Sequence, residues 1–269
     1  PYSALTIVST AAWGLGYFGM PHILLRFMAI EDEKKLKLSR RVATIWVVIS
    51  LFVAVFIGVI GYTMSKVGAL EMLTGSNSET IIVKISALLS QHGVIFALLA
   101  GVILAGILAS TMSTSDSQLL AASSAVSSDI LGAFRKDSSN KNGSMAAARI
   151  TLLVISVVAA FIARNPDSSV FAIVSFAWAG FGAAFGPVVL FSLFWKRTNK
   201  WGALAGMVCG GSMVFIWKYL IRPLGGIWNI YELLPAFLIA CAAIVIVSLL
   251  TPKPSKEIEE EFDRVAQMK

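Results

Sequence analysis

The chain has 269 residues, of which 57% are hydrophobic and 14% are charged, and its mean hydropathy is +0.80. Soluble domains carry about 25% charged residues, so this composition excludes a water-soluble domain. The net charge is +7, but the Lys and Arg residues lie in short segments between apolar runs. That arrangement is typical of membrane topology and not of a basic surface for nucleic acid.

A bilayer core about 30 Å thick is crossed by roughly 20 helical residues. On this measure the sequence predicts an all-α membrane protein with seven spans. The predicted spans cover residues 4–28, 42–64, 94–122, 147–163, 170–195, 203–220 and 233–250. Residues 79–92 alternate polar and apolar positions at helical spacing but are too polar to cross, which predicts a short helix at the outer surface.

The basic residues are divided unevenly between the two sides that seven spans define. One side holds 17 of the 22 Lys and Arg residues and the other holds 5. By the positive-inside rule the first side is cytoplasmic, so we expect a multi-pass protein of the cell inner membrane with a cytoplasmic C-terminus. The expected domains are a membrane part, residues 1–251, and a tail, residues 252–269, read as a solvated helical or disordered end.

The first span contains the sequence WGLGYFGMPH at residues 13–22. Three glycines weaken the helix there and Pro21 removes a backbone donor, which predicts a break near the middle of the membrane. Broken helices of this kind mark binding sites in transporters, because their freed amides and carbonyls can meet the charged ends of a solute. Trp13 and Tyr17, four residues apart, would add an aromatic face. A simple proline kink with glycines for close packing stays open as an alternative.

The third span carries a polar run, STMSTSDS, at residues 110–117. Ser110, Ser113, Thr114 and Ser117 follow the i, i+3, i+4, i+7 spacing and so place four hydroxyls on one stripe. Sodium requires oxygen ligands, which hydroxyls and helix carbonyls supply, although such hydroxyls can also simply bond to carbonyls four residues earlier. Asp116 either faces a polar cavity or a cation, or lies exposed at the interface.

Small residues are concentrated in the fifth and sixth spans. The fifth has Gly182 and Gly186 followed by Pro187, a combination that can bend as a gate or serve close packing. The sixth has glycines at four-residue intervals, Gly202, Gly206 and Gly210, which predict a helix-packing face.

Over nearly all of its length the chain resembles the sodium/solute symporter family, and most closely the sodium/proline symporters within it. The stretches that carry the resemblance are WGLGYFG at 13–19, PHIL at 21–24, RFMA at 26–29, MST at 112–114, QLL at 118–120, SS at 123–124, AWAGFGAAFGPVVLF at 177–191 and GALAGM at 202–207. The resemblance implies a LeuT-type inverted-repeat fold of thirteen helices. The seven spans here would be the last seven, the first of them broken, and the helices that precede them would be missing from this chain.

The resemblance also implies a function and site residues. It implies sodium-coupled uptake of L-proline across the cytoplasmic membrane by alternating access. Trp13, Tyr17 and Pro21 match the family's substrate-binding positions. The sodium-binding positions are matched by Ser113 and Thr114, with Ser110 at the place of a backbone-carbonyl ligand where the best-known member has Ala; residues 115–117 also depart from that member. Gly182 and Gly186, with Asp116, stand as possible cation or gating positions.

The expected partners are therefore a small solute such as proline, co-transported sodium, the lipid bilayer and the preceding helices of the same protein. We expect no other metal, no nucleic acid and no enzymatic activity, since no nucleophile, base and orienting group occur together. Three alternatives stay open at this point. They are a sodium symporter for another small amino acid or carboxylate, a transporter-like sensory membrane module, and a channel.

Overall fold

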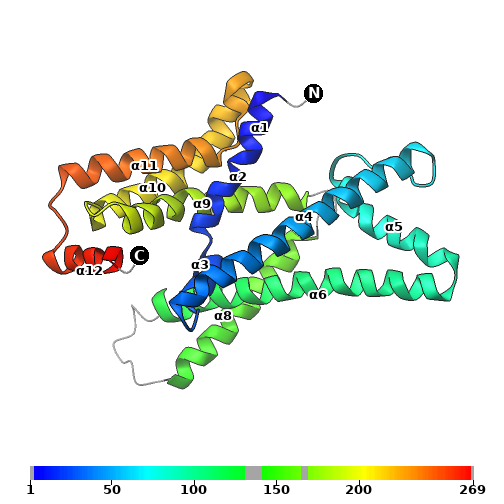
Figure 1. Ribbon diagram of the computed structural model, residues 1–269, viewed down its shortest axis with the longest axis horizontal. Helices are drawn as coiled ribbons and strands as arrows, with labels where there is room; N and C mark the ends of the chain where they lie inside the picture. Colours follow the sequence, from blue (N-terminus) through cyan, green and yellow to red (C-terminus); the bar gives the residue numbers. More distant parts are fainter. Residues whose placement is uncertain (1–2, 131–140, 165–168, 268–269) are drawn as a thin grey trace. The chain divides into compact units, whose positions relative to one another are not determined.

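The computed structural model describes residues 3–130, 141–164 and 169–267 (Figure 1). Every regular element in these ranges is helical. Six helices are long and apolar enough to cross a membrane: Leu36–Lys66, Val94–Ser127, Met145–Ile162, Val170–Phe194, Lys200–Leu224 and Leu233–Leu250. They correspond to the second to seventh predicted spans. The first predicted span is present as shorter helices, so the count of seven crossings stays a prediction.

The chain forms two compact units, each of which is described by itself. The first consists of Pro1–Met28 and Phe171–Lys269, and the second of Ala29–Val170. The helices of the first unit are α1 (Ala4–Ala11), α2 (Trp13–Gly16), η1 (Tyr17–Gly19), α3 (Pro21–Met28), α9 (Val170–Phe194), α10 (Lys200–Ile216), η6 (Trp217–Ile221), η7 (Arg222–Leu224), η8 (Gly226–Asn229), α11 (Leu233–Leu250) and α12 (Lys256–Gln267).

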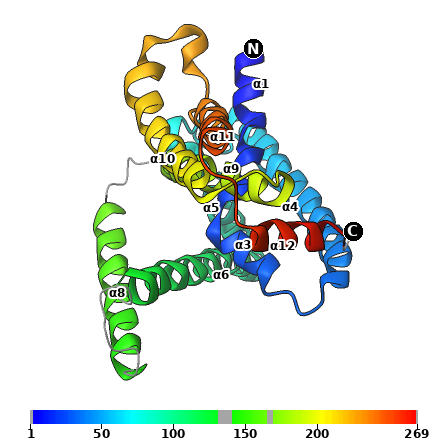
Figure 2. The same ribbon diagram turned by 90° about the vertical axis from the view of Figure 1, so that its left-hand side faces the viewer.

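Helices α10 and α11 lie side by side along their lengths (Figures 1 and 2). A Cβ atom added to Gly202 would overlap the Ser248 hydroxyl, and one added to Gly206 would overlap the Ile244 side chain. At Gly210 it would overlap a carbonyl of α9. Because each glycine lets a neighbouring helix approach to backbone distance, the predicted packing face of α10 is confirmed.

The core of this unit is built mainly from α9 and α11. Its buried residues are Ala12, Ala179, Ala183, Val214, Tyr231, Leu233, Ala236 and Phe237. Alanines supply four of these positions, so the helices pack closely and the few large side chains fill the remaining space. Tyr231 and Leu233 bring the start of α11 into the same core as Ala12, which directly precedes α2.

A buried amide joins the start of α10 to the end of α11. The side-chain oxygen of Asn199 accepts a hydrogen bond of 2.9 Å from the N–H of Gly202 and so caps α10. Its Nδ2 donates to the Thr251 hydroxyl at 2.7 Å and to the Pro252 carbonyl at 2.8 Å. The same side chain therefore satisfies groups at both helix ends and fixes the point where the chain leaves α11.

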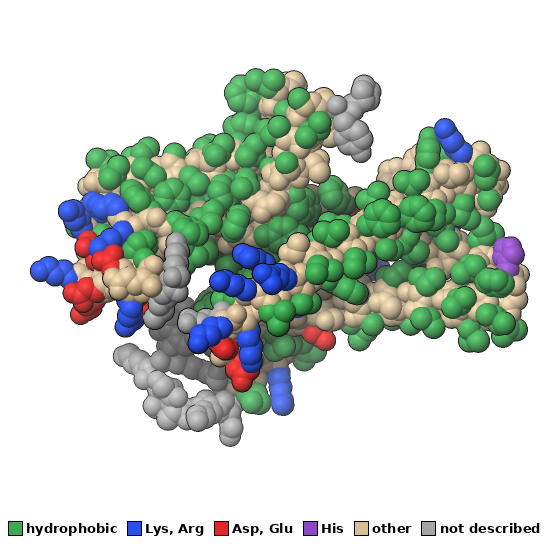
Figure 3. All heavy atoms as spheres, viewed as in Figure 1, with side chains coloured by type: hydrophobic (Ala, Val, Ile, Leu, Met, Phe, Trp, Pro, Cys, Tyr) green, Lys and Arg blue, Asp and Glu red, His purple; other side chains and the backbone are tan. Residues whose placement is uncertain are grey.

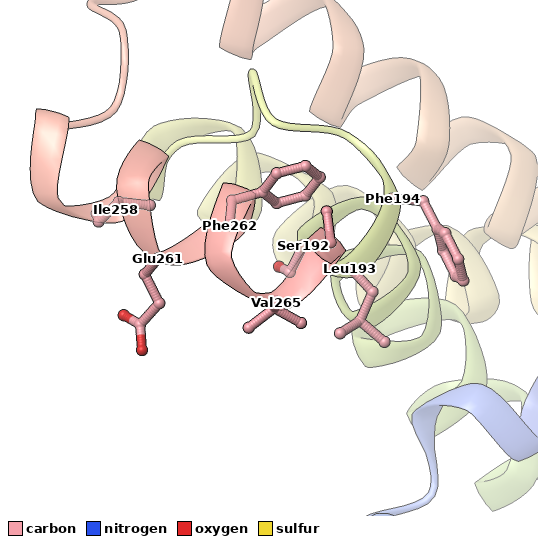
Figure 4. Close-up of a pocket in the computed structure, with 8 residues that line it drawn as sticks. Ser192, Leu193, Phe194, Ile258, Glu261, Phe262 and Val265 are labelled. Carbon is pink, nitrogen blue, oxygen red and sulfur yellow. The ribbon is translucent and has the colours of Figure 1, made fainter. Parts of the chain in front are cut away.

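Helix α12 lies against the end of α9. A cavity of about 530 Å³ is lined by Ser192 and Leu193 of α9 and by Ile258, Glu261, Phe262 and Val265 of α12 (Figure 4). Charged side chains gather on the rest of α12 (Figure 3). The tail, predicted as a solvated helical or disordered end, is thus helical over Lys256–Gln267, and its apolar residues Ile258 and Val265 remain 56% and 53% exposed.

Lys196, which follows the end of α9, forms ion pairs with α12. Lys196 Nζ lies 2.6 Å from Asp263 Oδ2 and 4.0 Å from Glu259 Oε2. The hydrogen bond and charge of Asp263 raise the pKa of Lys196 above its ordinary value. The pair is exposed to solvent, so it is expected to be sensitive to salt.

The second unit contains η2 (Glu33–Lys35), α4 (Leu36–Lys66), η3 (Gly75–Thr80), α5 (Ile81–Leu89), η4 (Ser90–His92), α6 (Val94–Ser124), the π-helical segment η5 (Ala125–Ile130) and α8 (Lys141–Ile162). Helix α5 with its flanking turns confirms the short helix predicted at residues 79–92. It packs on α4 at Gly61, where a Cβ would overlap the Ile81 side chain. Gly93 has a φ of 110°, a conformation that favours glycine, at the bend that leads into α6.

Apolar side chains cover the outside of α4 and α6 (Figure 3). On α4, for example, Trp46 and Phe52 are each 69% exposed. An exposed apolar surface of this extent is expected where helices lie against lipid or against other apolar helices. The second unit therefore has the surface of a membrane protein along its long helices.

The helix bounds agree with the predicted spans where apolar length and helix length coincide. Helix α11 covers the predicted 233–250, and α9 ends one residue before the predicted 195. Helix α4 begins at Leu36 and not at 42, because it continues through charged residues that lie outside the apolar run. Residues 131–140, which the topology prediction places on the cytoplasmic side, lie outside the described residues.

Candidate functional site

The first predicted span is interrupted in the structure. Helix α1 ends at Ala11, and the N–H of Tyr17 then donates to the carbonyl three residues earlier, at Gly14. Met20 has an extended backbone with φ −83° and ψ 113°. Pro21, which has no N–H to donate, starts α3. The predicted break is therefore present, and it occupies the residues around η1.

The side chain of Trp178, on α9, compensates this change in backbone hydrogen bonding. Since the N–H of Tyr17 bonds to Gly14, the carbonyl of Trp13 loses the donor that a regular α-helix would supply. The indole N–H of Trp178 donates to that carbonyl at 2.9 Å. A polar group freed by the break is thereby satisfied within the protein, as a group away from water must be.

Aromatic rings surround the same point. Trp13 stacks nearly parallel with three rings, at centroid distances of 5.4 Å from Phe171, 5.5 Å from Trp178 and 6.0 Å from Tyr231. Tyr17 meets Trp178 edge to face at 4.8 Å. Trp13 is partly buried in this cluster, whereas the Tyr17 side chain is 51% exposed. Two of the predicted substrate residues thus converge on one indole, and Tyr17 remains half exposed.

Glycines let the break approach α9 to backbone distance. A Cβ on Gly16 would overlap the Trp178 indole, and one on Gly19 would overlap the carbonyl of Phe181. By contrast, no neighbouring atom of the described residues lies within 4 Å of a Cβ added to Gly14. Two of the three glycines in the motif are therefore required by close packing, which is the alternative that the sequence left open beside a binding role.

Gly182 and Gly186, predicted as possible gating positions, lie on the face of α9 that meets the break. A Cβ on Gly182 would lie 2.7 Å from the Cα of Gly16, and one on Gly186 would lie 2.8 Å from the Phe237 ring. Pro187 is buried inside α9. These glycines serve close contact, and a gating role for them stays a prediction.

Tyr231 ties three elements together at this site. Its N–H donates to the Ser9 hydroxyl of α1 at 3.1 Å, and its own hydroxyl donates to the Ser175 carbonyl of α9 at 2.6 Å. Burial raises the pKa of Tyr231 well above its ordinary range, with the neighbouring Glu232 charge adding to the effect. The hydroxyl is accordingly a stable donor at neutral pH.

The predicted sodium residues lie on α6, in the second unit. Thr114 Oγ1 donates to the Ser110 carbonyl at 3.2 Å, and Ser117 Oγ donates to the Ser113 carbonyl at 3.0 Å. These are bonds to carbonyls four residues earlier, so that alternative is realised for two of the four hydroxyls. A donating hydroxyl still has oxygen lone pairs, so the stripe remains able to bind a cation.

Asp116 is exposed on the same helix. The π-helical segment η5 follows α6 without a gap, and Ser123 Oγ bonds to the Ala148 carbonyl of α8 at 2.7 Å. Irregular turns of this kind are frequent near functional sites. The predicted substrate residues and the predicted sodium residues belong to different units, so their proximity stays a prediction.

Sequence reasoning missed the partners that complete the aromatic cluster. Trp178 lay inside a quoted motif but was given no role, and Phe171 and Tyr231 were not singled out. The many aromatic residues of α9 were the available signal for Trp178 and Phe171. Nothing in the local sequence around Tyr231 indicates its position, because its partners lie on α1, α2 and α9.

The described helices, six of them long and apolar enough to cross a bilayer, indicate a multi-pass helical membrane protein. Its interrupted segment is of the kind that forms binding sites in transporters. The comparison with known proteins is more specific. The profile of the Sodium:solute symporter family matches residues 2–210, and the chain belongs to that family.

Three relatives illustrate the similarity. A sodium/proline symporter of Haemophilus influenzae is 41% identical over 262 residues, covering 97% of this chain and 51% of the relative. The osmoregulated proline transporter OpuE of Bacillus subtilis is 39% identical, covering 94% and 50%. A sodium/proline symporter of Escherichia coli is 39% identical, covering 96% and 50%. The chain thus spans about half the length of the curated relatives it matches. No solved structure matches it.

Proposed function

We propose that the full-length protein takes up L-proline together with sodium across the cell membrane by alternating access, and that it is a carrier and not an enzyme. The observation that carries this proposal is the interrupted helix whose Trp13 and Tyr17 both meet Trp178. Relatives at about 40% identity over most of the chain bear the names of sodium/proline symporters and proline transporters. They support the choice of solute.

The chemistry of the break fits a small zwitterion with an apolar ring. The pyrrolidine ring of proline suits the exposed part of Tyr17, and a ring nitrogen that carries a positive charge is attracted to an aromatic face. The start of α3 at Pro21 directs the positive end of a helix dipole at the break, which favours a carboxylate. Trp13, Tyr17 and Pro21 are therefore the proposed substrate-binding residues.

Sodium is proposed to bind on α6 between the hydroxyls of Ser113 and Thr114 and the carbonyl region of Ser110, with helices beyond this chain completing the shell. Sodium bound there would stabilise the state that accepts proline, which is the coupling that symport requires. Asp116 is proposed to attract the cation to this end of α6.

The proposed architecture is a LeuT-type inverted repeat in which the seven crossings of this chain are the last seven. Residues 1–251 form its membrane part and residues 252–269 a cytoplasmic tail. The uneven distribution of Lys and Arg supports this orientation. The preceding helices of the same protein would complete both binding sites.

The test is uptake of labelled L-proline by the full-length protein in proteoliposomes. We expect saturable uptake that is driven by an inward sodium gradient and is lost when potassium replaces sodium. Unlabelled proline should inhibit this uptake more strongly than other amino acids do. Equal uptake with and without sodium would contradict the coupling. Stronger competition by another solute would reassign the substrate.

A further inference from the structure

The segment between α10 and α11 contains a charged pair that the proposed sites do not use. Arg222 NH1 lies 2.8 Å from Glu232 Oε2, and the Glu232 side chain is only 2% exposed. Arg222 Nε also donates to Asn229 Oδ1 at 2.9 Å. Burying a carboxylate is costly unless a partner compensates it, and removal of that partner leaves the charge unpaired. The pair therefore fixes the conformation of this segment.

The pair closes a loop. Arg222 starts η7, and Glu232 directly precedes α11. Between them Gly225 and Gly226 have φ values of 74° and 61°, which reverse the chain. The loop bends at these two glycines, and the ion pair holds the two ends of the loop together. Tyr231 is the residue next to the buried carboxylate of Glu232.

Tyr231 carries the loop to the interrupted helix. Its ring is nearly parallel to that of Trp13, with an interplanar angle of 15°, and the residue is 9% exposed. It also bonds to Ser9 before the break and to Ser175 on α9. A change in the loop would thus disturb the contacts of Tyr231 with α1, with α9 and with the Trp13 ring at once.

We infer that Tyr231 is a positioning residue for the solute site, and that the Arg222–Glu232 pair holds it against Trp13. The inference rests on the proposed function, because it assigns the consequence of this contact to solute binding. Tyr231 acts through Trp13 and does not itself contact the solute. Release of the pair frees the loop, lets Trp13 move and weakens proline binding with little effect on the maximal rate.

The experiment measures KM and maximal rate for sodium-driven proline uptake by the full-length protein, normalised to the amount in the membrane. We expect Tyr231→Leu and Glu232→Gln each to raise KM by about 3- to 10-fold, the size of one lost aromatic contact. Tyr231→Phe keeps the ring but loses the bond to the Ser175 carbonyl, so it should raise KM less than Tyr231→Leu does. A maximal rate that falls while KM is unchanged would overturn the inference.

A double variant separates positioning from general damage. If the pair acts through Tyr231, then Tyr231→Leu combined with Glu232→Gln should be no worse than either single change. Additive losses would overturn the inference. The matched control is Glu261→Gln, which removes a carboxylate from the exposed pair with Arg264 on α12 and should leave KM unchanged.

A labelling measurement keeps the inference testable without transport. In a background without other reactive cysteines, Ser9→Cys places a thiol at the position that meets the backbone N–H of Tyr231. Its reaction rate with a water-soluble maleimide should rise several-fold when Glu232→Gln is added, and an unchanged rate would overturn the inference. Failure of the unmodified protein to transport proline would instead contradict the proposed function and would leave this measurement valid.

Discussion

The indole N–H of Trp178 donates a hydrogen bond of 2.9 Å to the backbone carbonyl of Trp13, a residue 165 positions away in the sequence. The bond is made at the end of α2, where the N–H of Tyr17 donates to the carbonyl three residues earlier and not four. It compensates the carbonyl that the change leaves without a helical donor. The same indole stacks on the Trp13 ring and meets the Tyr17 ring nearly at a right angle. A single side chain of α9 thus stabilises both the backbone and the rings of the break.

We expect Trp178→Phe to destabilise the protein, because the Phe ring retains most of the packing but leaves the Trp13 carbonyl unpaired. The loss should be about 1–3 kcal/mol, the cost of an unsatisfied buried polar group. It can be followed as a lower thermal unfolding midpoint in detergent. Trp201→Phe is the control, because Trp201 is 50% exposed on α10. Equal shifts for the two variants would show that the hydrogen bond contributes nothing.

The glycines of the break should differ sharply in their tolerance of a methyl group. Gly19→Ala would push a Cβ into the backbone of α9 and should cost about 1–3 kcal/mol or more, with loss of uptake. Gly14→Ala meets open space and should be neutral or slightly stabilising, because alanine favours the helix. Unfolding midpoints and uptake of the two variants, measured side by side, test this. Similar behaviour of both would contradict the packing found here.

The sodium assignment is tested on α6. Replacing Ser113 and Thr114 together by Ala should raise the sodium concentration for half-maximal proline uptake by at least about 10-fold, equivalent to ~1.4 kcal/mol of lost binding. Ser115→Ala serves as the control, because Ser115 lies off the stripe that Ser113 and Thr114 share on α6. An unchanged sodium dependence of the double variant would place the cation elsewhere.

Release of α12 should depend on salt and on Lys196. Lys196→Gln removes the partner of Asp263, so we expect faster amide exchange along α12, and raised salt should have the same effect on the unmodified protein. Arg264→Gln, on the exposed face of α12, is the control. Equal exchange in both variants would contradict the role of Lys196.

The pH dependence of this contact follows from the raised pKa of Lys196. A pKa that is higher in the folded state stabilises docking fully below the ordinary lysine value of 10.5, and the contribution is lost as pH rises through the raised value. Protection of α12, measured by proteolysis at one temperature, should therefore be constant between about pH 6 and 9. A marked loss of protection within that window would show that another group controls docking.

Much of the fold could be predicted from the sequence, because apolar length reflects bilayer thickness directly. The predicted span 233–250 coincides with α11, and the Gly-Pro motif at residues 13–22 located the break. Where helices extend beyond the hydrocarbon, as α4 does, hydropathy could not indicate their ends. The hydroxyl stripe of α6 could be read from spacing, but its bonds to earlier carbonyls could not, because a hydroxyl can serve either purpose.

The sequence by itself determined the membrane class, the position of the break and the family resemblance, since each depends on composition or on residues close together in the chain. Only the tertiary structure decided which residues surround the break. Tyr231 and Ser9 are 222 positions apart, and Trp178 reaches Trp13 from another helix. Such contacts depend on how helices pack, and packing is a property of faces brought together from distant parts of the chain.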